Sequence, residues 1–373
     1  MFKDKATLRS KIVQLSLLIA LLLCLATPAQ AQVRVPGFSP DKFGFAFDNS
    51  FSNIPYGPID VAGVPVSIGD ASNGMCGGMV FAARDFFEAG LARPTLTTPP
   101  SSGALFTYLS HRLFDSFNLP FGPLTYVSLM DPDFPDHDTW FSGSLAPHGR
   151  AWVTIHDNWP IIKADLDAGR LSPMALILVK SRDFTQMGHN HQVLAYGYDL
   201  TPNQDLTIHV YDPNAPNDNN VTVTLNIQHP GNTTDMFYAG TRVWAFFAQQ
   251  YVHQDPFGVH DGMNAREVSS APVYALVGGA RLWIKTPAEL QTYFGGWNAV
   301  SLVADNTVSL LPTVPRDGTI VQEVADPTVY LMENGQKRWL TSPSVLWRYG
   351  GWNVVRRVPS GSLAAITTGT PIN

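Results

Sequence analysis

The sequence predicts an α+β fold, because helical patterns come first along the chain and strand patterns follow them. After residue 76, apolar residues recur every three or four positions, which is typical of a helix with one buried face. From about residue 174 onward, apolar residues run continuously or alternate with polar ones, as they do in strands. Two similar segments beyond residue 270 predict a second, smaller and β-rich unit.

Residues 1–31 have the features of a cleaved signal peptide. Four basic residues precede an apolar core at residues 12–25, and Ala29-Gln30-Ala31 matches the A-x-A cleavage pattern. The apolar run is shorter than the roughly 20 residues that a membrane-spanning helix needs, although an uncleaved membrane anchor is the alternative. We therefore expect cleavage after Ala31 and a secreted or periplasmic protein that no membrane retains.

Charge and cysteine content limit the classes of function. Removing residues 1–31 would take away four basic residues and one acidic residue, and would change the formal net charge from −6 to −9. An acidic chain without a basic run is a poor binder of nucleic acid. Because Cys24 lies in the leader, Cys76 would be the single cysteine of the mature chain. Exported proteins usually pair their cysteines, so an unpaired thiol that oxidises readily indicates a reactive group.

Three helices are expected before the strands. They run from about Gly77 to Glu88, from Gly103 to Phe117, and over residues 157–169. Residues 32–68 predict an irregular segment with one alternating strand, and residues 118–150 contain five prolines and predict a loop. The aspartates at 131–138 in this loop indicate a solvated surface, with a calcium site as the alternative.

The strand patterns complete a catalytic domain over residues 32–251. Five strands are expected, at residues 174–180, 192–198, 206–211, 221–225 and 242–251. Residues 252–270 are polar and without a pattern, and we interpret them as a linker.

Residues 271–373 repeat a pattern in two units, at about 272–315 and 328–370. Residues 273–284 correspond to residues 329–340 with an offset of 56, and a Gly-Gly-Trp-Asn sequence recurs with an offset of 55. Each unit predicts a hairpin, a short helix after a proline, and a closing strand. We expect their tryptophans to lie in the core, with sugar-binding platforms as the alternative; these are Trp283, Trp297, Trp339 and Trp352.

Cys76 is the centre of the candidate site. Ser72 and Asn73 are good helix-capping residues, and Gly74 permits a tight turn just before the helix. Cys76 would then lie in the first helical turn, where the helix dipole favours a thiolate over a thiol. A buried structural thiol is the alternative.

A cysteine nucleophile needs a base and a group that orients the base. His191 begins one predicted strand and Asp212 ends the next, so antiparallel pairing would bring them together at one end of the sheet. His189 is the alternative base and Asn214 the alternative orienting residue. A metal site formed by Cys76, His189 and His191 is a further alternative, but we expect neither a metal nor another cofactor.

At these residues the chain resembles the papain-like cysteine peptidases, and most of all the bacterial type that processes bacteriocin leaders. The resemblance covers roughly residues 40–251 and lies in three motifs: Asn-Gly-Met-Cys76-Gly-Gly, Gly-His-Asn-His191-Gln-Val and Val-Tyr-Asp212-Pro. It implies a papain-like catalytic domain with Cys76 as nucleophile, His191 as general base and then acid, and Asp212 as the orienting residue.

The chain departs from this family at the oxyanion hole. The family places a glutamine upstream of the cysteine, whereas Asp70 occupies the position six residues before Cys76. Asn73 and the backbone N–H of Cys76 would supply the hydrogen bonds instead. The spacing between the cysteine and the histidine is also shorter than the roughly 130–150 residues of papain-like enzymes.

The sequence thus predicts a secreted cysteine hydrolase, acting on a peptide or protein substrate through a Cys-His-Asp triad. An acyl or amide transferase would use the same residues. From a different class, the alternative is a non-catalytic secreted binding or surface protein on a degenerate papain-like scaffold. A cell-surface or glycan partner for the two C-terminal repeats is a further expectation.

Overall fold

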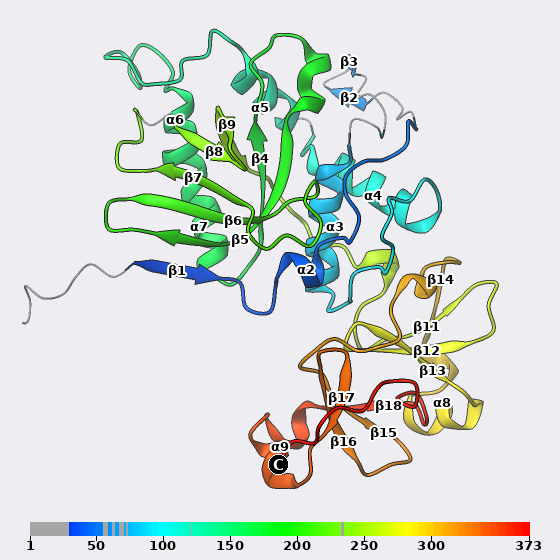
Figure 1. Ribbon diagram of the computed structural model, residues 1–373. Helices are drawn as coiled ribbons and strands as arrows, with labels where there is room; N and C mark the ends of the chain where they lie inside the picture. The colour runs from blue at the N-terminus through cyan, green and yellow to red at the C-terminus, as the bar shows by residue number, and fades with distance from the viewer. Residues whose placement is uncertain are drawn as a thin grey trace, which may run out of the picture.

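A computed structural model describes residues 30–54, 59–61, 64–66, 71, 74–119, 121–232 and 235–373. The chain combines helices with antiparallel sheet, which confirms the α+β class (Figure 1). Most of the expected signal peptide, and the candidate residue Asn73, lie outside the described residues. Within the described part, no helix is both long and apolar enough to span a bilayer.

The described part of the larger unit contains one antiparallel sheet of eight strands. Its central strands β4 and β5 are buried along almost their whole length, which explains why their sequences are so continuously apolar. The strand β1 (Ala31–Arg34) pairs with the distal half of β5. The remaining order is β10 (Ala245–Ala248), β4 (Ser172–Ile177), β5 (His191–Leu200), β6 (Asp205–Tyr211), β7 (Thr222–Asn226), β8 (Met236–Tyr238) and β9 (Thr241–Val243).

The helix α3 (Cys76–Glu88) packs against β5 and alongside α4 (Gly103–Ser116), close to the predicted bounds of both helices. Two glycines make this close packing possible. A Cβ at Gly78 would collide with the backbone carbonyl of Leu109, and one at Gly77 would collide with Ser116 and Gln192. The Gly-Gly pair after Cys76 therefore sets how near the cysteine comes to the sheet.

Four sequence predictions in the larger unit are wrong in part. The expected loop at 118–150 contains α5 (Phe121–Met130), which is almost uniformly apolar and so shows no helical stripe. Its Pro123 lies in the first turn, where a missing N–H costs nothing. The third predicted helix starts earlier and consists of α6 (Arg150–Trp152), a π-helical turn (Val153–Asn158) and α7 (Trp159–Asp167).

The strand expected over 242–251 is two short strands, β9 and β10, separated at residue 244. The strand β8 had no clear signal. Residues 32–68, where one alternating strand is expected, begin with most of β1 and continue into the short helix α2 (Pro40–Phe43). A small hairpin follows, made of β2 (Ile59–Val61) and β3 (Val64–Val66).

The aspartates at 131–138 form ion pairs with basic side chains. Asp136 lies 2.7 Å from both Arg150 and Lys180, and Arg182 contacts Asp131 and Asp133. Within the described residues, no three His, Cys, Asp or Glu side chains are grouped so that they would hold a metal ion. The aspartates of this segment are therefore paired with basic side chains of the same chain.

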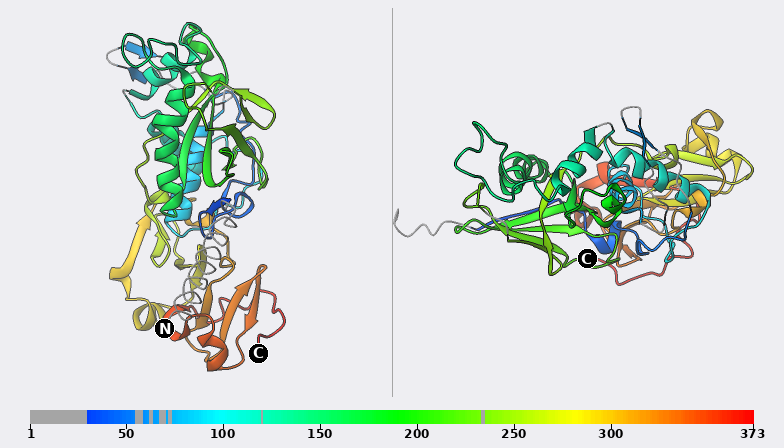
Figure 2. Two further views of the ribbon diagram at one scale, coloured as in Figure 1. Left: turned by 90° about the vertical axis from the view of Figure 1, so that its left-hand side faces the viewer. Right: turned by 90° about the horizontal axis from the view of Figure 1, so that it is seen from above.

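Two four-stranded sheets with the same strand order follow at one end of the molecule (Figures 1 and 2). In each, a hairpin precedes a short helix that begins at a proline, α8 (Pro287–Tyr293) or α9 (Pro343–Trp347). The first sheet has β13 (Ala280–Ile284), β12 (Val273–Val277), β11 (Asn264–Glu267) and β14 (Val300–Val303). The second has β17 (Gln336–Trp339), β16 (Val329–Glu333), β15 (Ile320–Glu323) and β18 (Val355–Val358).

Both sheets begin one strand before the expected units. The strand β11 lies in the segment 252–270 that the sequence predicts as a linker, and β15 lies between the two expected repeats. Four short 3-10 turns complete this part of the chain; they are Pro256–Gly258, Trp297–Ala299, Val308–Leu310 and Gly351–Val354.

The tryptophans of these sheets do not fill the core, contrary to the expectation. Trp283, Trp297, Trp339 and Trp352 are 49%, 54%, 43% and 51% exposed. Aliphatic side chains form the cores of the small sheets instead. The tryptophans are thus surface residues whose neighbourhood needs its own explanation.

Candidate active site

Cys76 is the first residue of α3 and is partly exposed. The chain enters the helix through Gly74, whose φ of +92° is a conformation that favours glycine. Just before the cysteine, the backbone N–H of Met75 donates a hydrogen bond of 2.5 Å to Oδ1 of Asn49. The side chain of Asn49 is thereby held beside the helix N-terminus.

The structure brings His191 and Asp212 together as the sequence predicts. His191 is the first residue of β5, and Asp212 directly follows β6, its antiparallel neighbour. Nε2–H of His191 donates to Oδ1 of Asp212 over 2.7 Å. Both side chains are buried, with the residues only 4% and 3% exposed. The pair is therefore sheltered from water at one end of the strands β5 and β6.

Cys76 completes the group, since its side chain lines the same cavity as His191 and interacts with the imidazole so as to raise its pKa. Because Asp212 occupies Nε2, Nδ1 is the ring nitrogen left for the sulfur. Burial alone would lower the pKa of His191, but hydrogen bonds and charge attraction from Asp212 and Cys76 outweigh burial and raise that pKa to about 9. The imidazole is therefore held in its protonated form at neutral pH.

Asp212 has three hydrogen-bond donors. Besides His191 they are the backbone N–H of Asn214, at 2.8 Å from Oδ1, and the hydroxyl of Tyr238, on Oδ2. Burial favours the neutral carboxyl group, but these donors and the charge of His191 prevail and hold the pKa of Asp212 below its ordinary value. Asn214 thus acts through its backbone, and the alternative in which it orients the histidine receives no support.

Tyr238 is a site residue that the sequence did not reveal. It belongs to the short strand β8, and its pKa is raised by burial and by the nearby charge of Asp212, so it remains a proton donor. A lone tyrosine in a three-residue strand has no signal that distinguishes it from other core tyrosines.

His189 does not lie on the strand, contrary to the expectation. It ends a 3-10 turn (Phe184–His189) and is exposed. It lines the same cavity as Cys76 and His191, yet these three side chains do not form a metal-binding group. His191 is accordingly the base candidate that the geometry favours.

Cys76 and His191 open into a cavity of about 230 Å³. Its lining is mainly polar, which suits a substrate with a peptide backbone. The other lining residues are Asn49, Gly74, Leu178, Gly188, His189, Asn190, Asn214 and Tyr238. Asn49 is the second residue that the sequence missed, because it precedes Cys76 by 27 positions in an irregular segment.

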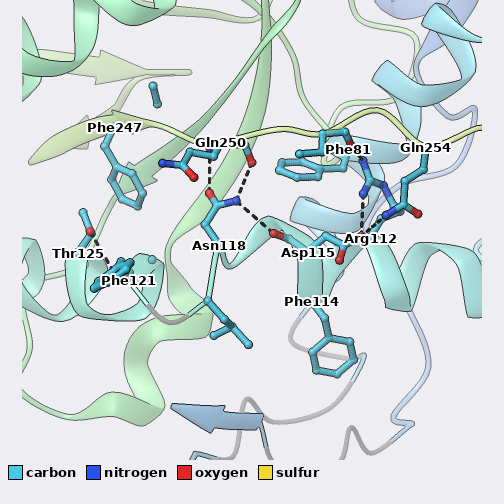
Figure 3. Close-up of a pocket in the computed structure, with 14 residues that line it drawn as sticks. Phe81, Arg112, Phe114, Asp115, Asn118, Phe121, Thr125, Phe247, Gln250 and Gln254 are labelled. Carbon is cyan, nitrogen blue, oxygen red and sulfur yellow. Dashed lines mark hydrogen bonds and ion pairs between the residues drawn. The ribbon is translucent and has the colours of Figure 1, made fainter. Parts of the chain in front are cut away.

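A larger cavity of about 700 Å³ lies elsewhere, between α4, α5 and the segment that follows β10 (Figure 3). Several of its polar side chains already have hydrogen-bond partners within the protein. Asn118 exchanges two hydrogen bonds with the backbone of Gln250, and Asp115 accepts from Arg112 and Gln254. No group of the triad lines this cavity, and we assign no chemistry to it.

The site thus joins a thiol at a helix N-terminus, a protonated imidazole and a buried carboxylate, which is the arrangement that nucleophilic catalysis by cysteine requires. Comparison with known proteins adds no further assignment: no family model matches the chain, and no curated protein or solved structure is significantly similar to it.

Proposed function

We propose that the protein is an exported cysteine hydrolase, most simply a peptidase, that acts through Cys76, His191 and Asp212. The observation that carries the proposal is that Cys76 meets the hydrogen-bonded pair of His191 and Asp212 at one cavity. The cysteine helix on an antiparallel sheet that bears the other two residues supports a papain-like catalytic domain.

In the first half of the reaction, the Cys76 thiolate attacks an acyl carbonyl carbon and forms a C–S bond. His191 holds the proton that came from the sulfur and delivers it to the leaving amine as the C–N bond breaks. In the second half, His191 takes a proton from water, whose oxygen attacks the thioester and frees the acid. An amine in place of water would give the transferase product from the same acyl enzyme.

Asn49 supplies one donor for the oxyanion that forms during both attacks. Its Oδ1 is engaged by the N–H of Met75, which directs Nδ2 to the other side. A Cβ at residue 74 would collide with this Nδ2, so Gly74 provides the space that the amide occupies. The backbone N–H of Cys76 at the helix N-terminus is the second donor. Asn73, which the sequence predicts as an oxyanion donor, lies outside the described residues. Its role therefore stays a prediction.

Labelling with iodoacetamide tests the proposed nucleophile. Rapid alkylation of Cys76 at neutral pH is expected, and His191→Ala should slow it by tenfold or more because the imidazolium no longer stabilises the thiolate. His189→Ala is the matched control, since it removes a histidine from the same cavity but outside the triad. Labelling that is slow in the wild type and unchanged in His191→Ala would instead indicate a non-catalytic scaffold.

Peptide-library profiling then tests the activity itself. The wild type should cleave a subset of peptides and Cys76→Ser should cleave none while keeping its circular dichroism spectrum. Adding a dilute primary amine separates hydrolase from transferase, because a transferase passes most of the acyl group to the amine whereas a hydrolase releases the acid. A glycan or cell-surface partner for the C-terminal sheets remains a prediction outside this test.

A further inference from the structure

The second small sheet carries an additional strand-like segment on its free edge. Residues 367–373 run parallel to β17, with bridges from Lys337 to Thr368 and from Leu340 to Ile372. The N–H of Ile372 donates to the carbonyl of Trp339 at 2.8 Å, and the N–H of Thr341 donates to the carbonyl of Ile372 at 3.1 Å. Figure 1 shows this end of the chain beside β17 and α9.

Ile372 also fills an apolar recess. Its side chain packs against the buried cluster beneath α9, which includes Val329, Leu340 and Leu346. The edge of this sheet is therefore closed twice, by backbone hydrogen bonds and by one β-branched aliphatic side chain.

The first sheet has the corresponding edge strand, β13, but the chain pairs only with the beginning of that strand. The N–H of Arg281 donates to the carbonyl of Pro312 at 2.8 Å, as the N–H of Lys337 donates to Thr367 at 2.9 Å in the second sheet. The chain then turns away, and the N–H of Arg316 donates to Gly278. In the described part of the chain, no segment pairs with β13 beyond Arg281 on this side.

An open pocket of about 220 Å³ lies where the first sheet lacks that segment. Its floor is Val273, Ile284 and Leu290, which by the offset of 56 correspond to Val329, Leu340 and Leu346, the residues that hold Ile372. The exposed Trp283 and Trp297 stand at its sides. One recess is thus filled by the chain itself, and its counterpart is open.

We propose that the edge of β13 binds an extended peptide segment of a partner protein. The segment lies parallel to β13, exchanges hydrogen bonds with the backbone of Trp283 and Lys285, and places a β-branched aliphatic side chain between Trp283 and Trp297. Exposed sheet edges recruit strands in this way, and pockets for side chains then give specificity. A second copy is not the source, because its own residues 367–373 are engaged on β17.

A labelled peptide Thr-Thr-Gly-Thr-Pro-Ile-Asn, copied from residues 367–373, is the probe. Fluorescence anisotropy on the full chain should show saturable binding, and replacing the isoleucine by aspartate should abolish it. Ala271→Trp, at an exposed position of the pocket rim, should weaken binding at least tenfold, whereas Ala288→Trp, exposed on α8 outside the pocket, should not. Lys285→Pro removes the backbone donor without filling the pocket and should weaken binding similarly.

Hydrogen exchange locates the bound peptide. Added peptide should protect the amides of residues 283–285. If Ala271→Trp and Lys285→Pro both leave peptide binding unchanged, the peptide has replaced residues 367–373 on β17. That result would overturn the proposal. Self-association of the chain that Ala271→Trp abolishes would make a second copy the occupant and would equally overturn it. The proposal does not depend on Cys76, so its outcome is independent of the tests of the proposed peptidase activity.

Discussion

His191 and Asp212 hold opposite charges at a place where burial alone would neutralise both. The charge of each residue stabilises the charged form of the other, so the two residues titrate as a coupled pair. Because the pKa of His191 is raised in the folded state, its stabilisation is complete below about pH 6.5 and is lost as the pH rises through about 9. The stabilisation from Asp212, with its lowered pKa, is lost only as the pH falls below the ordinary carboxylate range.

Asp212→Asn tests this coupling. The variant keeps the shape of the side chain but removes its charge, so the pKa of His191 should fall from about 9 by roughly one unit or more. An NMR titration of the imidazole measures the change directly. Asp235→Asn, at an exposed position, is the control. An unchanged titration in Asp212→Asn would show that the carboxylate does not hold the proton on the histidine.

Asn49→Ala tests the oxyanion donor separately from the nucleophile. Turnover of a cleaved peptide should fall by about 10²- to 10³-fold, since one donor to the developing oxyanion is lost. Alkylation of Cys76 by iodoacetamide should keep its rate, because no oxyanion forms in that reaction. Asn53→Ala, exposed in the same segment, should alter neither measurement. Parallel loss of both rates would assign Asn49 a structural role only.

At the scale of elements, the sequence predicts best where an element is long and its apolar residues follow a regular pattern. The helix α3 and the strands β5 and β6 carry regular apolar patterns, so the positions of Cys76, His191 and Asp212 followed from them. The helix α5 was missed because it is apolar on all sides. Asn49 and Tyr238 come from irregular chain and a three-residue strand, where no periodicity exists and only tertiary packing decides the position.

The Gly-Gly pair after Cys76 allows the close packing of α3 against α4, which a substitution at Gly78 can test. Gly78→Ala places a methyl group against the backbone carbonyl of Leu109, which cannot move aside as a side chain can. We expect a loss of about 1–3 kcal/mol in the free energy of unfolding, measured by urea denaturation, together with a fall in Cys76 labelling. Thr107→Ala, exposed on α4, should be nearly neutral. A neutral Gly78→Ala would mean that α3 and α4 are not tightly packed at this point.

At the scale of the whole molecule, the main apolar core of the larger part extends into the first small sheet. Ala265, Leu276 and Val303 of the first small sheet belong to the same apolar cluster as the buried face of α3. At the end of α3, the N–H of Asp261 donates to the carbonyl of Ala89 at 2.9 Å, and Arg316 donates to the carbonyl of Gly90. The small sheets are therefore part of the support of the cysteine helix.

Because the larger part and the first small sheet share an apolar core, we expect them to unfold together. Tryptophan fluorescence, to which tryptophans of both parts contribute, and far-UV circular dichroism should give one coincident transition in urea. A chain ended at residue 251 should unfold at a lower urea concentration than the full chain, because it exposes apolar side chains that Leu276 and Val303 now cover. Two separate transitions, or a truncated chain of equal stability, would show that the two parts fold independently.

The pairing of β1 with β5 has a consequence for maturation. Ala31, after which the sequence predicts cleavage, is paired with Leu200 in the structure of the full chain. A peptidase needs an extended, unpaired backbone in its own active site, so a bond beside a docked strand is protected from it. If the leader is removed there, the cut must come before β1 pairs with β5, so trimming of the chain precedes completion of the sheet.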